Sequence, residues 1–101
     1  MSTLEATFTK EAPEVMKVYD GLVKTLNSLK GLDDKTKKLI FFGIKVTERD
    51  VNSVAYFVPV LKKLGATREE IRDTVLLSLA ICGLSGVSAC LGPAMEIYDR
   101  S

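Results

Sequence analysis

The stretch LGATREEI, residues 64–71, marks the end of one helix and the beginning of the next. Gly65 is the residue type that most often follows the last turn of a helix, because glycine adopts the left-handed backbone conformation without strain. Thr67 and Glu70 have the spacing of a capping box, in which each side chain accepts a hydrogen bond from the other residue's backbone N–H. The stretch therefore predicts two helices joined by a tight turn, the second beginning after Thr67.

Apolar residues at spacings of three and four on both sides of this stretch predict further helices. Before it, a helix from about Thr47 or Glu48 carries the stripe Val51, Val54, Ala55, Val58, Leu61 and Leu64, and Pro59 predicts a bend within it. After it, Ile71, Val75 and Leu79 share a helix face. Gly83 to Gly86 then predict a break before a fifth helix, which Gly92-Pro93 ends or bends.

Two more helices are predicted towards the N-terminus. Pro13 fits the first turn of a helix with the stripe Val15, Met16, Tyr19, Leu22, Val23, Leu26 and Leu29. Asp33 is the predicted N-cap of a helix that contains the apolar residues Leu39, Ile40, Phe41, Phe42, Ile44 and Val46. Residues 1–10 are polar and mixed, so we expect them to be flexible. The 101 residues are thus predicted to form one all-α domain, a bundle of about five helices.

The composition indicates self-association and argues against two classes of partner. Hydrophobic residues make up 47% of a chain too short to bury several helices that are apolar on all sides, so we expect a homo-oligomer. The 14 basic and 13 acidic residues give a net charge of +1, which favours no nucleic-acid partner. Residues 74–95 are uncharged and long enough to span a membrane, but glycines interrupt them and their flanks show no charge bias. A helix at a subunit interface explains this run as well, and predicts that Leu77→Asp or Gly86→Leu disrupts assembly.

The chain contains no histidine and only two cysteines, Cys82 and Cys90, which are not spaced as C-x-x-C. This excludes the usual zinc ligand sets, and we expect no metal and no cofactor. No secretory signal is visible at the N-terminus, so a reducing, cytoplasmic location is expected. Each cysteine then fits the role of a small buried apolar residue.

The segment from Leu32 to about Tyr98 resembles the carboxymuconolactone decarboxylase and alkylhydroperoxidase D-like family. LDDKTKKLI, residues 32–40, is similar to the family's opening segment before its first buried helix. LGATREEI is similar to the family's helix end, glycine turn and capped helix start, at the matching distance from the first segment. The resemblance implies an alkylhydroperoxidase D-like helical fold assembled into a homotrimer or homohexamer.

The redox members of that family carry C-x-x-C-x-x-x-H, with a glutamate twelve residues before the first cysteine. The resemblance places the cysteine positions on Asp50 and Ser53, the histidine position on Phe57 and the glutamate position on Lys38. None of these residues can supply the attacking thiolate, the resolving thiol or the proton relay. We therefore expect no CxxC-dependent peroxidase activity. The family's decarboxylating activity also relies on a histidine in this region, and its absence puts that activity in doubt.

The candidate pocket comprises these positions and their neighbours: Lys38, Glu48, Asp50, Ser53, Tyr56 and Phe57. With Lys45, these side chains could hold a carboxylated ligand, or a lysine whose pKa is lowered by burial could act as acid or base. The same charges also fit a solvated surface or a helix end. Three functions agree with the residues. One is a scaffold that binds a small ligand or a partner, with Phe57 filling the pocket; the second is a divergent enzyme acting on a small carboxylated substrate. The third, which the flanking charges disfavour, is a membrane-associated protein that uses residues 74–95.

Overall fold

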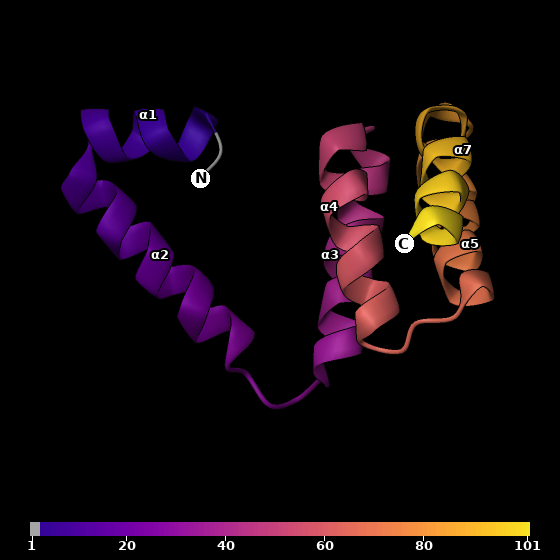
Figure 1. Ribbon diagram of the computed structural model, residues 1–101, viewed down its shortest axis with the longest axis horizontal. Coiled ribbons are helices and arrows are strands. Elements are labelled where there is room, and N and C mark those ends of the chain that lie inside the picture. Colours follow the sequence, from indigo (N-terminus) through magenta and orange to yellow (C-terminus); the bar gives the residue numbers. More distant parts are fainter. Residues whose placement is uncertain (1–2) are drawn as a thin grey trace. The chain divides into compact units, whose positions relative to one another are not determined.

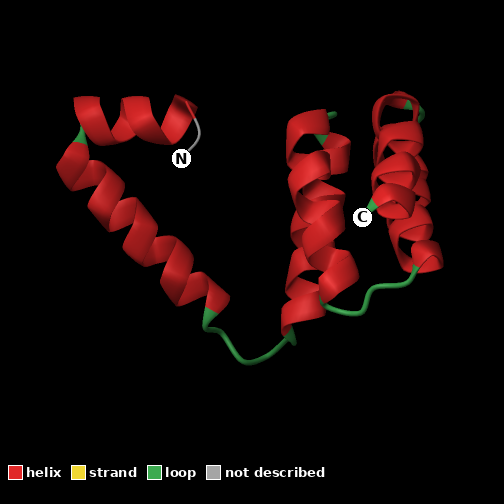
Figure 2. Ribbon diagram, viewed as in Figure 1, coloured by secondary structure: helices red, strands yellow, loops and turns green. Residues whose placement is uncertain are grey.

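The computed structural model describes residues 3–101, and every regular element in that range is a helix (Figure 1, Figure 2). The prediction of an all-α fold is confirmed. Contacts divide the chain after Leu32 into two compact units, which are described separately. The N-terminal unit contains α1 (Thr3–Glu11) and α2 (Pro13–Asn27); the second contains α3 (Asp34–Thr47), α4 (Val51–Lys63), α5 (Arg68–Leu77), α6 (Leu79–Cys82) and α7 (Ser85–Arg100).

In the N-terminal unit, α1 and α2 are separated only by Ala12. The Ala12 N–H donates to the Phe8 carbonyl at 2.9 Å, but Pro13 has no N–H with which to continue the helix. Ala12 therefore leaves the helical region, with φ −146° and ψ 66°, and the chain changes direction there (Figure 1). Residues 3–10 are helical: no glycine or proline interrupts them, and Phe8 contacts Tyr19. The flexibility expected for residues 1–10 stays a prediction. Residues 1 and 2 lie outside the described residues.

The second unit is a helical bundle in which α4 contacts both α3 and α7, and α7 also contacts α5 (Figure 1). Each of these four helices contributes residues at spacings of three or four to one core, as the stripes in the sequence predict. The buried core residues are Phe42, Val46, Val54, Val58, Leu61, Ala66, Ile71, Val75, Cys90 and Ala94. Their removal from water stabilises the unit by about 25 cal/mol per Å² of apolar surface.

The capping residues predicted from the sequence begin their helices as expected. The Asp33 side chain accepts a hydrogen bond from the Thr36 N–H at 2.7 Å, which fixes the start of α3. At the start of α5, Thr67 accepts from the Glu70 N–H at 3.1 Å and Glu70 accepts from the Thr67 N–H at 2.8 Å. Gly65, with φ +92°, ends the preceding turn. The capping box and the glycine turn are therefore confirmed.

The uncharged run of residues 74–95 is divided among three helices. Gly83, with φ +68°, separates α6 from α7, whereas Gly86, Gly92 and Pro93 lie inside α7 and do not end it. No helix among the described residues has both the length and the hydropathy needed to cross a membrane. Gly86 is buried against α3, since a Cβ there would lie 2.8 Å from the Val46 carbonyl oxygen. This contact lies within one protomer, so Gly86→Leu would disturb the packing of α7 on α3; its effect on assembly stays a prediction.

Candidate functional site

The turn between α3 and α4 brings four polar residues of the sequence prediction together. The chain reverses here because Arg49 adopts a left-handed conformation, with φ +58°, and α4 begins at Val51, after the range predicted from sequence. The Lys45 Nζ lies 3.2 Å from a Glu48 carboxylate oxygen and 3.8 Å from Asp50 Oδ2. Asp50 Oδ1 accepts from the Ser53 N–H at 3.0 Å, and its Oδ2 accepts from the Ser53 hydroxyl at 2.8 Å. Asp50 and Ser53 thus form the N-terminal cap of α4.

The electrostatics of this cluster hold Asp50 ionised. The hydrogen bond from the Ser53 N–H, followed by that from its hydroxyl, lowers the pKa of the Asp50 carboxyl below its ordinary value of 3.8. Desolvation opposes this shift, and the nearby positive charge of Lys45 adds to it. A carboxylate of this kind accepts hydrogen bonds well, but it is a poor general acid near neutral pH.

The other candidate residues are Lys38, Tyr56 and Phe57. Lys38, on α3, places its Nζ 5.4 Å from the centroid of the Phe41 ring. Tyr56 is 63% exposed. Phe57 is half-buried and packs against the core, with ring centroids 6.3 Å from Phe41 and 5.1 Å from Tyr56. Phe57 therefore fills space between helices and leaves no polar group at its position.

The two cysteines lie on different helices. Cys82 ends α6, and its thiol donates to the Ser78 carbonyl at 3.4 Å. Cys90 is buried within α7, where burial and, to a smaller extent, the charge of Asp50 raise the pKa of its thiol. Both are free thiols, and the raised pKa of Cys90 is the opposite of the lowered pKa that a reactive cysteine needs. Within residues 3–101, no three histidine, cysteine, aspartate or glutamate side chains gather as a metal site.

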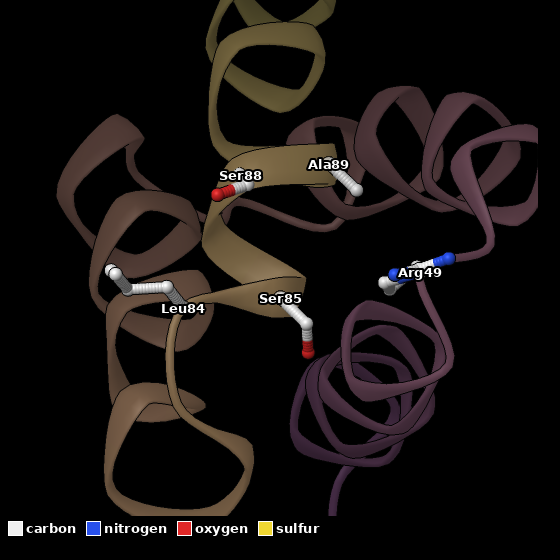
Figure 3. Close-up of a pocket in the computed structure, with 5 residues that line it drawn as sticks. All are labelled: Arg49, Leu84, Ser85, Ser88 and Ala89. Atoms are coloured by element: carbon white, nitrogen blue, oxygen red, sulfur yellow. The ribbon is translucent and has the colours of Figure 1, made fainter.

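A hollow of about 520 Å³ lies beside the α3–α4 turn and was not predicted from the sequence. It is lined by Arg49, Leu84, Ser85, Ser88 and Ala89. Figure 3 shows Arg49 on the side of α7 towards which the Ser85 hydroxyl and Ala89 point, while the Ser88 hydroxyl points to the other side. Sequence reasoning missed Arg49 because a left-handed arginine leaves no periodic signal. The one available signal was a residue placed between a helix end and the capping Asp50.

Comparisons with known proteins identify the family. A model of the carboxymuconolactone decarboxylase family matches residues 13–96. The chain belongs to the carboxymuconolactone decarboxylase family. A solved structure of the apo form of a carboxymuconolactone decarboxylase family protein from Legionella pneumophila is similar, with 30% sequence identity and a TM-score of 0.81. The match covers 97% of this chain and 87% of the Legionella protein. No curated protein matches the chain.

The structure shows what the residues that the sequence resemblance assigns to the family's redox motif do in this chain. Asp50 and Ser53, assigned to the cysteine positions, form the cap of α4, and Phe57, assigned to the histidine position, packs against the core. Since the chain has no histidine, no other imidazole replaces the missing one. The first turn of α4 is therefore built from residues that stabilise the helix end.

Proposed function

We propose that this protein is a self-assembling scaffold of the carboxymuconolactone decarboxylase family that binds a small molecule or a protein partner and performs no dithiol chemistry. One observation carries the proposal: the residues at the family's redox positions are engaged with each other and with the core. Asp50 and Ser53 share two hydrogen bonds, and Phe57 packs beside Phe41. A cytoplasmic location is part of the proposal, and the free thiols of Cys82 and Cys90 agree with it.

Self-association is supported by apolar side chains that the protomer leaves exposed. None of the residues of α2 is buried, although its apolar side chains recur at helical spacing. In the second unit, Leu77, Ile81 and Leu84 are 71%, 83% and 70% exposed. Leu77 and Ile81 also line a hollow of about 340 Å³, together with Thr36, Leu39, Ile40, Gly43, Thr47, Thr74 and Ser78. Exposed apolar patches of this kind mark interfaces, and we propose that they are covered in a homotrimer or homohexamer.

The absence of dithiol chemistry is tested by a hydroperoxide consumption assay with tert-butyl hydroperoxide and dithiothreitol. We expect consumption at the rate of the protein-free control. Turnover that is abolished by Cys82→Ser would overturn the proposal, because it would show that a thiol outside the motif positions has taken over the reaction. Cys90→Ser is the matched control, since the Cys90 thiol is buried.

Assembly is tested by light scattering on the wild type and on Leu77→Asp. We expect a wild-type mass of three or six times the 11.1 kDa protomer, and a smaller mass for the variant. Arg72→Asp is the control. It places an aspartate on the same helix, at a residue that does not line the hollow of about 340 Å³, and should leave the mass unchanged. Far-UV circular dichroism checks that both variants keep their helices. An unchanged mass for folded Leu77→Asp contradicts this interface.

A divergent enzyme is the second candidate, and the cluster of Lys45, Asp50 and Ser53 favours it. The Lys45 Nζ lies 3.8 Å from Asp50 Oδ2, which also accepts a hydrogen bond from the Ser53 hydroxyl. Such a cluster can orient a small carboxylated substrate, with the lysine as a charge partner. Release of CO₂ from lactone carboxylates by the wild type, lost in Lys45→Met, would favour this candidate over the scaffold.

A further inference from the structure

We propose that the hollow beside the α3–α4 turn is a binding site for a small organic anion, in which the Arg49 guanidinium and the Ser85 hydroxyl hold a carboxylate or phosphate group. The inference deepens the proposed scaffold function and rests on it, because it names the ligand class that the scaffold binds. The site lies at the turn of the motif positions but is lined by different side chains: Arg49, Leu84, Ser85, Ser88 and Ala89.

The Arg49 guanidinium is available to a ligand. It makes no ion pair and no hydrogen bond to any side chain or carbonyl among residues 3–101, unlike Arg68 and Arg72, which pair with Asp99 and Asp73. A planar guanidinium donates two parallel hydrogen bonds to a carboxylate or a phosphate, and such paired, charge-assisted bonds are stronger than hydrogen bonds between neutral groups.

The carboxylates that flank Arg49 in sequence pair with Lys45 and not with Arg49. Glu48 and Asp50 both lie within 4 Å of the Lys45 Nζ, at 3.2 and 3.8 Å. Asp50 also accepts hydrogen bonds from the N–H and hydroxyl of Ser53. These contacts engage both carboxylates with other residues and leave the Arg49 guanidinium at the hollow without an ion pair among the described residues.

The other lining residues suit an organic acid. The Ser85 hydroxyl has a poor acceptor within the protein, the Cys82 carbonyl at 3.4 Å, so a ligand oxygen at normal hydrogen-bonding distance would be a better one. Figure 3 shows this hydroxyl on the Arg49 side of α7. Ala89, which points to the same side of α7, supplies apolar surface for the carbon part of the ligand (Figure 3). A volume of about 520 Å³ admits a molecule the size of a substituted aromatic acid.

The turn geometry permits a clean test, because Arg49 occupies a position that glycine fills without strain. The Asp50 N–H donates to the Lys45 carbonyl and the Arg49 N–H to the Val46 carbonyl, each at 3.0 Å. The Gly65 turn has the same pattern, with Ala66 bonded to Leu61 and Gly65 to Lys62. Arg49→Gly therefore removes the guanidinium while keeping the turn, and its unfolding midpoint should equal or exceed that of the wild type.

The experiment is a ligand-observed NMR titration of the full chain with benzoate, using benzamide as the uncharged analogue and inorganic phosphate as competitor. We expect benzoate to bind with a dissociation constant on the order of 1 mM, benzamide to bind more weakly, and phosphate to displace benzoate. Loss of the charged hydrogen bonds in Arg49→Gly should weaken benzoate binding about tenfold. Arg49→Lys keeps the charge but not the paired donors, so its affinity for benzoate should lie between that of the wild type and that of Arg49→Gly. The control Arg100→Ala removes an arginine at the other end of α7 and should bind as the wild type does.

Three results would overturn the inference: no benzoate binding up to about 10 mM, equal binding of benzamide, or a loss in Arg49→Gly of less than about threefold. Each of these leaves the scaffold proposal standing if hydroperoxide turnover is also absent. Thiol-dependent turnover would instead overturn the scaffold proposal, whatever the benzoate titration shows. The two proposals therefore fail by different measurements.

Discussion

Replacing Gly86 by alanine should destabilise the protein, although alanine is the better helix former. Gly86 lies where α7 crosses α3. An added Cβ would lie 2.8 Å from the Val46 carbonyl oxygen, 3.0 Å from Val46 Cγ1 and 3.1 Å from the Ser78 hydroxyl. The Cβ of Gly43→Ala, by contrast, would meet Thr74 Cγ2 at 3.5 Å, an ordinary contact. The two glycines are thus a matched pair inside helices, one tightly enclosed and one with room.

The change in unfolding free energy caused by Gly86→Ala is the sum of two opposed contributions. Alanine in a helix is favoured over glycine by about 0.5–1 kcal/mol, which should appear almost undiminished in Gly43→Ala. At Gly86 the overpacking term of about 1–3 kcal/mol acts against it, because the neighbours are held in place. The Val46 carbonyl accepts from the Arg49 N–H at 3.0 Å, and the Ser78 hydroxyl donates to the Val75 carbonyl at 2.7 Å. We expect a net loss of about 1–2 kcal/mol for Gly86→Ala.

The assay is urea unfolding followed by far-UV circular dichroism, with wild type and both variants at one protomer concentration. A fixed concentration is needed because the apparent stability of an oligomer depends on it. Gly86→Ala should unfold at lower urea than the wild type, and Gly43→Ala at equal or higher urea. If Gly86→Ala were as stable as Gly43→Ala, α7 would not cross α3 at this glycine, and the packing described for the second unit would be refuted.

Two further predictions concern polar contacts of the second unit. Asp50→Ala should destabilise the protein by about 0.5–2 kcal/mol near neutral pH, because α4 loses its N-cap. The pKa of Asp50 is lowered in the folded state, so the stability that its carboxylate contributes is fully present above the ordinary pKa of 3.8. That stability is lost as the pH falls through the lowered pKa of the folded state. The urea unfolding curves of the variant and the wild type should therefore converge in acid. Tyr98→Phe should cost about 1 kcal/mol, because the Tyr98 hydroxyl donates to the Ala66 carbonyl at 2.8 Å. Tyr56→Phe, at an exposed tyrosine, is its control, and equal unfolding midpoints for the two would contradict the Tyr98 contact.

Most of the second unit could be predicted from the sequence because its helices begin with local chemistry. Asp33, and Thr67 with Glu70, cap helices through side chains that reach only three residues along the chain, and such contacts depend little on the rest of the fold. Gly65 marks its turn for the same reason. The apolar stripes then indicate which helix faces pack, and the core contains residues from each of them.

The course of α7 could not be predicted, because packing overrides local preference there. Gly92 and Pro93 normally end or bend a helix, yet α7 continues through both to Arg100. Cys90 and Ala94, on either side of them, are fully buried in the core. The burial of these neighbours favours a continuous helix over the loss of one backbone hydrogen bond at proline. This balance depends on contacts with other helices, which sequence spacing does not reveal.

The candidate site was predictable only in part, because its geometry depends on a residue with no signal of its own. The register of the family motif located Asp50, Ser53 and Phe57, but the meeting of Lys45 with Asp50 requires the chain to reverse at Arg49. Arginine is an unusual choice for a left-handed position. An equivalent turn at Gly65 uses the expected residue, so the contrast between the two turns becomes visible only in the structure.

The register from the sequence resemblance assigns the family's dithiol positions to Asp50 and Ser53, at the first turn of α4. The first turn of a helix has unsatisfied N–H groups, and these stabilise a thiolate as readily as they stabilise a carboxylate. In this chain the Ser53 N–H and hydroxyl both donate to Asp50, and Lys45 lies near the Asp50 carboxylate and nearer to that of Glu48. These donors are therefore already engaged by a carboxylate of the protein itself. The positive charge that remains for a ligand belongs to Arg49 on the neighbouring hollow, and this makes anion binding there a more direct consequence of the structure than a repaired redox reaction at the motif.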